Sequence, residues 1–519
     1  MKKIIQTILV FILIGLTGCR PSADPSGSAD ALIPVDDHYR NTYEIFVYSF
    51  HDSNGDGIGD LNGVKEKLNY IQDLGFNAIW LMPVCSSPTY HKYDVSDYQA
   101  IDPQYGTMED FETLVSECHQ RNMEVYTDLV LNHTSTHHPW FKEASNYLQS
   151  GKDYNENECP YLGYYHFSKN AEYGYAKLEN SEWYYESRFW DQMPDLNLDN
   201  QNVRDEIKEI MNFWLDKGVD GFRLDAVTSY YTSDDEKNIE FLKWVNETGK
   251  SIKKDCYFVA EAWTGLEQYA PYYQSGIDSF FDFAYSGSDG IITKTVKGQI
   301  SAKQFLESLV KEEQLFKSYH SDFINAPFYT NHDMARACGY FPGDNGTELK
   351  LALGLHFMMG GNAFLYYGEE IGMRGSGKDE NKRAPMFWSK ESDCTGVPNM
   401  DSITMKYDPV DMQMEDENSI YNYVKEILKI RNRYPVIARG ETLINETLTT
   451  DTLAVFEKKK DGLDSVQIII NLSKDPQSIS LEDYTTLSSE VSASGKTSQI
   501  HGNTLDISGY GIVVMTSDQ

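Results

Sequence analysis

Short apolar runs alternate with amphipathic segments through the first part of the chain. Three such runs are YEIFVYSF (43–50), NAIWLMPV (77–84) and NMEVYTDLVLNH (122–133). Their β-branched and aromatic residues are typical of buried strands. Between them, apolar residues recur at helical spacing in two sets, Val64, Leu68, Ile71 and Leu74, then Phe111, Leu114, Val115 and Cys118. The pattern predicts a strand–helix alternation.

The alternation continues with five more strand candidates: VDGFRLDAV (219–227), CYFVAEAW (256–263), GIDSFFDFAY (276–285), INAPFYTNHD (324–333) and NAFLYYG (362–368). Helical patterns follow some of them, at 203–217, 302–317 and 419–433. Eight strand–helix units predict an α/β fold, the closed (β/α)8 TIM barrel, whose chemistry belongs at the carboxyl ends of the strands.

Two segments depart from this alternation. Residues 136–196, after the third strand, are rich in Tyr, Trp, Asn and Gly and too long for an ordinary loop. We interpret them as an inserted domain that divides the barrel into 37–135 and 197–432. From 433 to 519 the pattern becomes alternating strands with turn residues between them, which predicts a C-terminal antiparallel β-sandwich.

The first residues have the pattern of an export signal. Lys2 and Lys3 precede an apolar run, and Leu16-Thr17-Gly18-Cys19 closes it as a lipobox. We expect 1–19 to be the signal, Cys19 to become acylated, and the polar, proline-bearing stretch 20–36 to be a flexible tether. The protein would then be exported and anchored in the bacterial membrane through lipid. An ordinary cleaved signal with a chance cysteine is the alternative.

Charge and cysteine content narrow the choice of partners. With 45 Lys+Arg against 79 Asp+Glu, the formal net charge is −34, which disfavours binding to nucleic acid and favours a neutral substrate. The six other cysteines are scattered, without a CxxC pair or metal-ligand spacing. We expect isolated thiols, although export to an oxidising compartment would allow one or two disulfide bridges.

Polar clusters follow four of the predicted strands. They are Asp128, Asn132 and His133; Arg223 and Asp225; Glu261; and Asn331, His332 and Asp333. Strand ends of a barrel meet at one rim, so these carboxylates and histidines should converge. Cleavage of a glycosidic bond needs an anion at the anomeric carbon and a proton for the leaving oxygen, and Asp and Glu supply both.

With these motifs in this order, the chain resembles the α-amylase family of glycoside hydrolases (family 13). The resemblance implies that Asp225 is the nucleophile, held by Arg223, and that Glu261 is the acid/base, its pKa raised by neighbouring carboxylates. Asp333 resembles the third carboxylate, which grips sugar hydroxyls, while Asp128 braces Arg223. The resemblance further implies that His133 and His332 bind hydroxyls, and that Tyr93 stacks under the same sugar.

The loop DSNGDGIGD (52–60) offers hard oxygen ligands suited to Ca²⁺ at alternating positions: Asp52, Asn54, Asp56, the carbonyl of Ile58, and Asp60. It resembles a calcium loop of oligo-1,6-glucosidase-like members, and an ion-free turn is the alternative. A second calcium site of many amylases uses a Lys-His pair, where this chain has Thr228 and Ser229, so that site is not carried over.

Details around the site bear on the bond that is cleaved. MPDLN (193–197) resembles members intermediate between oligo-1,6-glucosidases and neopullulanases, including lipoprotein α-amylases. Ala226 follows the nucleophile where α-1,6-specific members tend to carry Val, so the resemblance favours cleavage of α-1,4 bonds. Tyr90 stands where exo-acting glucosidases tend to have a pocket-closing Asp, so it favours endo cleavage of starch, glycogen or maltooligosaccharides. An exo-acting α-glucosidase, an oligo-1,6-glucosidase, a neopullulanase-like enzyme and transglycosylation remain alternatives, as does, remotely, a non-catalytic glucan-binding surface protein.

Overall fold

The computed structural model describes residues 37–481 and 483–517. The expected signal 1–19 with Cys19 and the tether 20–36 lie outside these residues. In the described chain, no helix combines the length and apolar character needed to cross a bilayer. The six cysteines that fall within it are buried and unbridged, as expected of isolated thiols.

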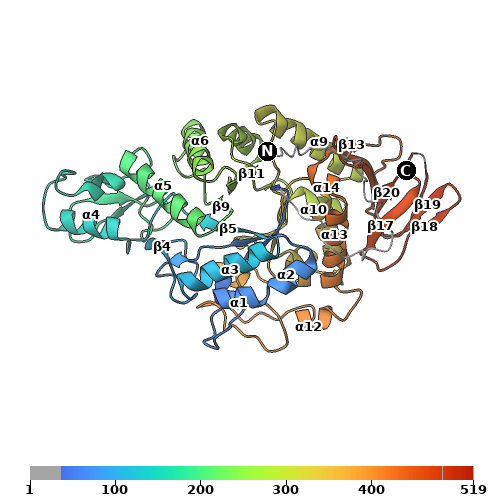
Figure 1. The fold of residues 1–519 in the computed structure, drawn as a ribbon, viewed down its shortest axis with the longest axis horizontal. Helices are drawn as coiled ribbons and strands as arrows, with labels where there is room; N and C mark the ends of the chain where they lie inside the picture. Colours follow the sequence, from blue (N-terminus) through green and yellow to red (C-terminus); the bar gives the residue numbers. More distant parts are fainter. Residues whose placement is uncertain (1–36, 482, 518–519) are drawn as a thin grey trace, which may run out of the picture.

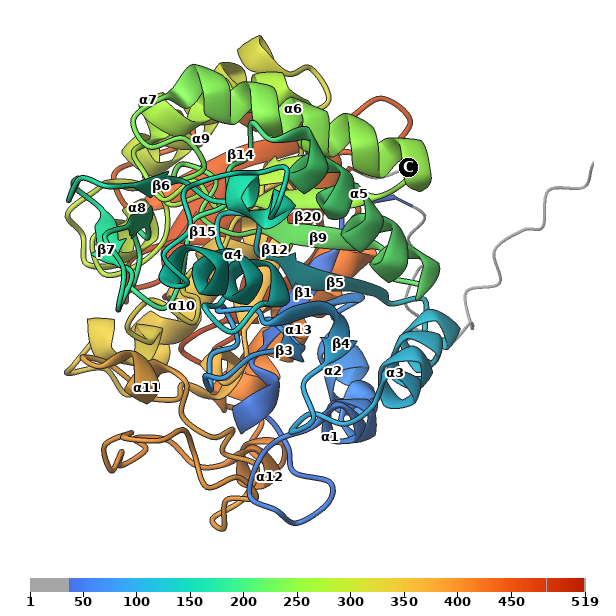
Figure 2. The same cartoon turned by 90° about the vertical axis from the view of Figure 1, so that its left-hand side faces the viewer.

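A parallel sheet curls into a barrel at the centre of the molecule (Figures 1 and 2). Its strands are β1 (Asn41–Ile45), β2 (Ala78–Leu81), β5 (Glu124–Leu129), β9 (Gly221–Leu224), β10 (Tyr257–Ala260), β11 (Ser279–Phe280) and β12 (Ala363–Tyr366). Hydrogen bonding orders them β11-β10-β9-β5-β2-β1-β12. Each contains part of a predicted run, and their order in space follows the chain.

The short segment 326–328 closes the barrel between β11 and β12. Phe281 pairs with Ala326 and Phe328 pairs with Phe364, both in parallel. The amide N of Phe364 donates to the carbonyl of Pro327 at 2.9 Å, but Pro327 has no N–H with which to extend a ladder. The predicted eight-stranded barrel is therefore confirmed, with its seventh strand reduced to two bridges.

Helices surround the barrel: α1 (Leu61–Glu66), α2 (Leu68–Leu74), α3 (Met108–Gln120), α5 (Gln201–Asp216), α6 (Asp235–Ile252), α7 (Leu266–Tyr269), α8 (Ile291–Val296), α9 (Ala302–Tyr319), α10 (Thr347–Met358) and α13 (Ile420–Arg433). Val64, Leu68, Ile71 and Leu74 are fully buried, as predicted. The helix predicted from these four residues is divided into α1 and α2 at Lys67, where ψ is 4°. Helix α10 is not among the helices predicted from hydrophobic periodicity, because it is buried on every side.

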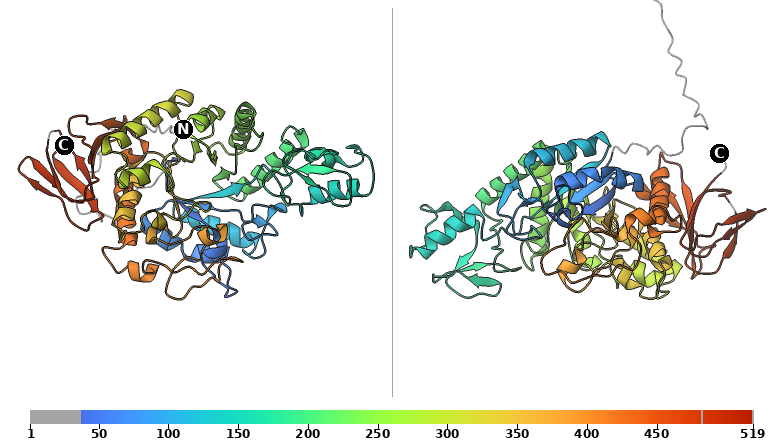
Figure 3. Two further views of the ribbon diagram at one scale, coloured as in Figure 1. Left: turned by 180° about the vertical axis from the view of Figure 1, so that it is seen from behind. Right: turned by 90° about the horizontal axis from the view of Figure 1, so that it is seen from below.

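The segment after β5 forms the inserted unit. It contains α4 (Pro139–Gln149), the 3-10 turn η2 (Pro160–Tyr164) and an antiparallel sheet of β6 (Phe167–Ser168), β8 (Tyr184–Glu186) and β7 (Tyr175–Lys177). Before it, β3 (Cys85–Ser86) and β4 (Asp97–Ile101) form a small hairpin. The unit projects from the barrel at the end opposite the C-terminal sheets (Figures 1 and 3).

Two antiparallel sheets form the C-terminal unit. One contains β13 (Glu441–Ile444), β14 (Leu453–Lys459), β15 (Val466–Asn471), β20 (Gly511–Thr516) and β17 (Thr486–Ser492), and the other β16 (Gln477–Ser480), β19 (Thr504–Ile507) and β18 (Gln499–His501). Leu453 and Val455 pack with Leu505 of the second sheet, whereas Ala454 and Phe456 belong to the core shared with the barrel. Both faces of β14 are therefore buried, as in a sandwich docked on a barrel.

The remaining short elements lie in connections: η1 (Val47–Ser49), η3 (Ala270–Ser275), η4 (Ala337–Tyr340), η5 (Glu369–Ile371), α11 (Asp379–Lys382), α12 (Val410–Gln413) and α14 (Val436–Arg439). The run 43–50 is thus a strand only to Ile45 and then turns as η1, at the carboxyl end of the barrel.

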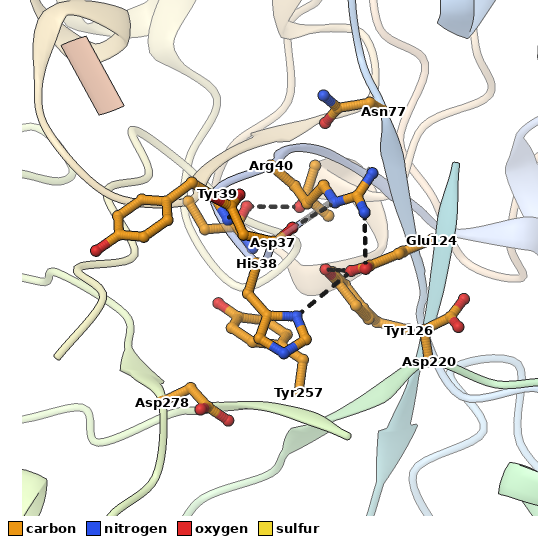
Figure 4. A network of polar contacts seen from close by, with 12 residues as sticks. Asp37, His38, Tyr39, Arg40, Asn77, Glu124, Tyr126, Asp220, Tyr257 and Asp278 are labelled. Atoms are coloured by element: carbon orange, nitrogen blue, oxygen red, sulfur yellow. Dashed lines mark hydrogen bonds and ion pairs between the residues drawn. The ribbon is translucent and has the colours of Figure 1, made fainter. Parts of the chain in front are cut away.

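Polar contacts cover the amino end of the barrel, where the described chain begins (Figure 4). The guanidinium of Arg40 donates to Glu124 at 2.9 Å and to the carbonyl of Asp37 at 2.9 Å. The His38 ring lies 5.3 Å from that of Tyr257. Arg439 donates twice to the Asp37 carboxylate, at 2.6 and 2.7 Å. The chain therefore enters the barrel at the end opposite the carboxyl ends of its strands.

Candidate active site

The polar residues predicted from the strand ends meet at the carboxyl mouth of the barrel. Asp128 lies within β5 and His133 follows it, Arg223 and Asp225 lie at the end of β9, and Glu261 follows β10. His332 and Asp333 follow the seventh strand, and Tyr93 comes from the connection after β2. All of them are linked by direct contacts, described next, so the predicted convergence is observed.

Arg223 is the hub of this cluster. Its Nη1 lies 2.5 Å from Asp128 Oδ1 and 2.6 Å from Asp225 Oδ1, and its Nη2 lies 2.9 Å from Glu261 Oε2. The arginine is 1% exposed, so these interactions are shielded from water. One guanidinium therefore fixes three carboxyl groups in a single arrangement.

Tyr93 and His332 form one wall of the site. Their rings are stacked with centroids 5.6 Å apart, and the Tyr93 hydroxyl lies 2.8 Å from His332 Nε2. The ring of His133 reaches the Tyr93 carbonyl with Nε2 at 3.2 Å. Burial lowers the pKa of His133. A neutral imidazole beside a ring face suits the binding of an uncharged sugar hydroxyl.

Asp333 lies between two cations. Its Oδ2 is 3.0 Å from His332 Nε2, and its Oδ1 is 2.8 Å from Arg383 Nη2. Burial alone would raise the pKa of Asp333, but His332 and Arg383 hold it well below its usual range. Asp333 is therefore an anion with a fixed orientation.

Glu261 differs from its neighbours in its proton affinity. Burial, with help from the carboxylates of Asp225 and Asp333 and against the attraction of Arg223, raises the pKa of Glu261 to about 7. The direction agrees with the prediction, although burial contributes more than the neighbouring carboxylates. Its Oε2 accepts from the Ala226 amide at 3.2 Å, while Oε1 is buried without a hydrogen-bond partner in the described structure.

The backbone beside Asp225 has an unusual conformation. Ala226 has φ of 47°, in the left-handed region that residues with a Cβ rarely adopt. Its N–H reaches Glu261 Oε2, and the next amide, of Val227, donates to the Glu261 carbonyl at 3.0 Å. This strained turn therefore ties the strand that carries Asp225 to the strand that carries Glu261.

Exposed aromatic rings border the site. Phe189, from the inserted unit, is 52% exposed and lies 5.5 Å from the His133 ring. Trp263 is 51% exposed and stacks on Phe283 with centroids 5.2 Å apart. Exposed aromatic rings of the inserted unit and of the segment after β10 therefore border the carboxylate cluster.

The loop 52–60 turns its acidic oxygens toward its own backbone. Asp52 accepts from the amides of Gly55 at 2.7 Å and Gly57 at 2.6 Å, and Asp60 caps α1 by accepting from Gly63 at 2.7 Å. Against partial burial, these amides lower the pKa of Asp52. Among residues 37–481 and 483–517, no group of three carboxylate, histidine or cysteine side chains is gathered as a metal site.

Two residues at the site were not predicted. Arg383 reaches Asp333 from the long connection after β12, where no strand end marks it. Glu44 lies inside β1, with Oε1 2.6 Å from His332 Nδ1. The one sequence signal for Glu44 is its position within a predicted buried strand. A charged residue is rarely buried without a partner, so such a position indicates that a partner exists.

Comparison with known proteins places this architecture in a family. Residues 44–440 match the model of the α-amylase catalytic domain. The chain is 40% identical to α-amylase 3 of Dictyoglomus thermophilum over 451 residues, covering 84% of this chain and 85% of that protein. It is 30% identical to an oligo-1,6-glucosidase of Parageobacillus thermoglucosidasius over 534 residues, covering 85% and 91%.

The solved structure of Eubacterium rectale Amy13B superposes with a TM-score of 0.90 and 46% identity, covering 93% of this chain and 96% of that one. The match extends through the barrel, the inserted unit and the C-terminal sheets, since so little of either chain is left outside it. The chain belongs to the α-amylase family of glycoside hydrolases.

Proposed function

We propose that the protein is a retaining, endo-acting α-1,4-glucan hydrolase, with Asp225 as nucleophile, Glu261 as acid/base and Asp333 as the carboxylate that binds the sugar. The observation that supports these roles best is the pair of carboxyl groups held by Arg223. Asp225 lies 2.6 Å from the guanidinium, while Glu261 has a pKa raised to about 7 and a free Oε1. One group is thus suited to attack and the other to donate a proton.

In the first step the Asp225 carboxylate attacks the anomeric carbon. The glycosidic C–O bond breaks, and the Glu261 proton passes to the leaving oxygen. The anionic carboxylates around the sugar stabilise the positive charge that develops at the anomeric carbon. A covalent glucosyl–Asp225 ester and a shortened glucan result.

In the second step Glu261, now a carboxylate, removes a proton from water. The hydroxide equivalent attacks the anomeric carbon, the ester bond to Asp225 breaks, and Glu261 is again protonated. If a sugar hydroxyl replaces water, the same step transfers the glucosyl chain instead. His133, His332 and Tyr93 are proposed to hold the sugar through both steps.

A product time course tests the bond and the mode of attack. Soluble starch, maltoheptaose and isomaltose are incubated with the enzyme, and the products are separated by chromatography. Early mixed maltooligosaccharides from starch support endo cleavage. Glucose as sole product, or a preference for isomaltose, would contradict this proposal and favour an exo-acting α-glucosidase or an oligo-1,6-glucosidase. The similarity to an oligo-1,6-glucosidase is the reason to include isomaltose in the test.

We also propose that loop 52–60 binds Ca²⁺. The support is the chemistry of its donors: Asp52, Asn54, Asp56, Asp60 and the Ile58 carbonyl are hard oxygen ligands in nine residues. Each carboxylate has lone pairs beyond those that accept from the amides, so Asp52 and Asp60 can bind the ion while they keep these hydrogen bonds. Calorimetry with calcium or with a chelator tests this. A melting temperature that the chelator leaves unchanged would favour an ion-free turn.

For the N-terminus we propose export and acylation of Cys19, supported only by the lipobox pattern and by the polar stretch before Asp37. The protein would then lie at the bacterial membrane, on the periplasmic face or the cell surface. Detergent-phase partitioning of the wild type and of Cys19→Ala tests this. Recovery of both in the aqueous phase would rule out the anchor.

A further inference from the structure

A buried carboxylate lies behind the substrate-binding histidine. Glu44 is in the middle of β1 and 1% exposed, and its Oε1 lies 2.6 Å from His332 Nδ1. The other ring nitrogen, Nε2, lies 3.0 Å from Asp333 Oδ2 and 2.8 Å from the Tyr93 hydroxyl. A neutral imidazole carries one N–H, so a ring with carboxylates at both nitrogens is satisfied only when both are protonated.

The charged groups around His332 favour the same state. Burial disfavours the imidazolium, but Asp333 and Glu44 more than offset it and raise the pKa of His332 to about 9. The groups that face the ring come from several elements: Glu44 on β1, Asp128 on β5, Arg223 on β9, Glu261 after β10, Tyr366 on β12, and Tyr93, Asp333 and Arg383 from connections. Both arginines already pair with other carboxylates.

Glu44 has neither of these arginines as an ion-pair partner. In the part of the chain that the structure describes, His332 is its one ion-pair partner. A buried carboxylate without a counter-ion is costly, so Glu44 and His332 stabilise each other's charged forms. The pairing is reciprocal: removal of the carboxylate also removes the reason for the ring to stay charged in a buried site.

We propose that Glu44 is a positioning residue that keeps His332 doubly protonated, so that its Nε2–H stays directed at Asp333 and Tyr93 during cleavage. The inference rests on the proposed function, because Asp333 is the carboxylate assigned to sugar binding. Without Glu44, Asp333 alone opposes the effect of burial, so the ring loses its second proton at a lower pH than in the wild type. The proton that remains serves Nδ1 or Nε2, and an unprotonated Nε2 would set two lone pairs against each other 3.0 Å apart.

The kinetic test uses Glu44→Gln, which keeps the size of the side chain and one oxygen that can accept from Nδ1–H, and removes its charge. For each pH from 5 to 8.5, kcat/KM on maltoheptaose is divided by the wild-type value, so that the shared dependence on Glu261 cancels. The ratio should be close to one near pH 5 and fall several-fold or more by pH 8.5, because His332 loses its second proton at a lower pH than in the wild type. A ratio that does not change with pH would overturn the proposal.

Two further variants separate charge from structure. Glu44→Asp keeps the carboxylate, and its ratio should stay nearly constant with pH. Glu370→Gln is a matched control, since Glu370 is also a fully buried carboxylate at the barrel mouth, but its Oε1 accepts from the hydroxyls of Tyr43 and Tyr70, with no histidine. Any activity loss in that variant should be independent of pH. A falling ratio in Glu370→Gln as well would show a general effect of losing a buried charge and overturn the assignment.

A spectroscopic measurement needs no substrate. NMR of enzyme with carbon-13-labelled histidine, with His332→Gln to assign the signal, reports the protonation of the ring directly. The wild-type His332 signal should remain that of an imidazolium up to about pH 8 and titrate at least one pH unit lower in Glu44→Gln. A wild-type signal that titrates near pH 6.5 would refute the inference, even where the glucan proposal holds. If the enzyme is inactive on glucans but His332 is an imidazolium, the proposed function is refuted and the inference about Glu44 and the protonation of His332 stands.

Discussion

Replacing Glu261 by Gln tests the central chemical assignment most directly. The substitution keeps the volume and an oxygen for the Ala226 amide at 3.2 Å, and it removes the transferable proton. With its pKa raised to about 7 from 4.5, about half of Glu261 is protonated at pH 7, against about one molecule in 300 for an ordinary carboxyl. Burial therefore keeps a protonated carboxyl group available in the site at neutral pH.

We expect kcat/KM on maltoheptaose to fall by about 10²- to 10⁴-fold in Glu261→Gln, the usual worth of a general acid. An activated substrate, such as a chloronitrophenyl maltotrioside, leaves as a stabilised phenolate and needs little protonation, so its kcat/KM should fall much less. The second step still lacks its base. A burst of phenol followed by slow turnover is therefore expected, and azide, which needs no base, should accelerate that turnover.

The pH dependence provides the internal check. Wild-type kcat/KM on maltoheptaose should decline above about pH 7 as Glu261 loses its proton, because the acid must be protonated to act. With the activated substrate that decline should be absent in the variant. Equal losses on both substrates, or near-native turnover of maltoheptaose by Glu261→Gln, would refute the reasoning and exclude Glu261 as the acid.

Other substitutions test the surroundings of the site and the domain that supports it. Arg383→Met removes the cation 2.8 Å from Asp333 and should lower kcat/KM on maltoheptaose about 10- to 100-fold in steady-state assays; an unchanged value would show that His332 suffices. Tyr90→Asp should raise the proportion of glucose among maltoheptaose products, measured by chromatography, if this position decides whether the cleft is open. Ile469→Ala, fully buried between the C-terminal sheets, should cost about 2–5 kcal/mol and lower the melting temperature by calorimetry while KM stays constant.

The barrel could be predicted because its strands carry a local signal. Strands β9 (Gly221–Leu224) and β10 (Tyr257–Ala260) are buried on both faces, and the residue after each strand, Asp225 or Glu261, marks the mouth. The seventh strand shows the limit of this reasoning. Its run 324–333 was recognised, but only 326–328 pair in the sheet, because Pro327 cannot donate and only tertiary contacts fix that length.

The residues of the candidate active site could be predicted as a set but not as a network. Asp225, Glu261 and Asp333 follow strands, so their convergence follows from topology alone. Arg383 lies 50 residues from Asp333 along the chain, in a connection without periodicity, and no local pattern encodes that contact. Helix α10 was missed for the opposite reason, since a helix buried all round has no polar face to reveal its period.

The charges of the site explain why Glu261, among its carboxyl groups, is suited to hold the proton. Five buried or half-buried carboxyl groups meet three cations there: Glu44, Asp128, Asp225, Glu261 and Asp333 against Arg223, His332 and Arg383. Glu44 and Asp333 are matched by His332 and Arg383, which leaves Arg223 to serve three carboxyl groups. A proton on one of these three lowers their mutual repulsion, and Asp225 and Asp128 hold the shortest contacts to the arginine. A site with a proton on Glu261 still has an excess of negative charge, which complements the positive charge of an oxocarbenium-like transition state.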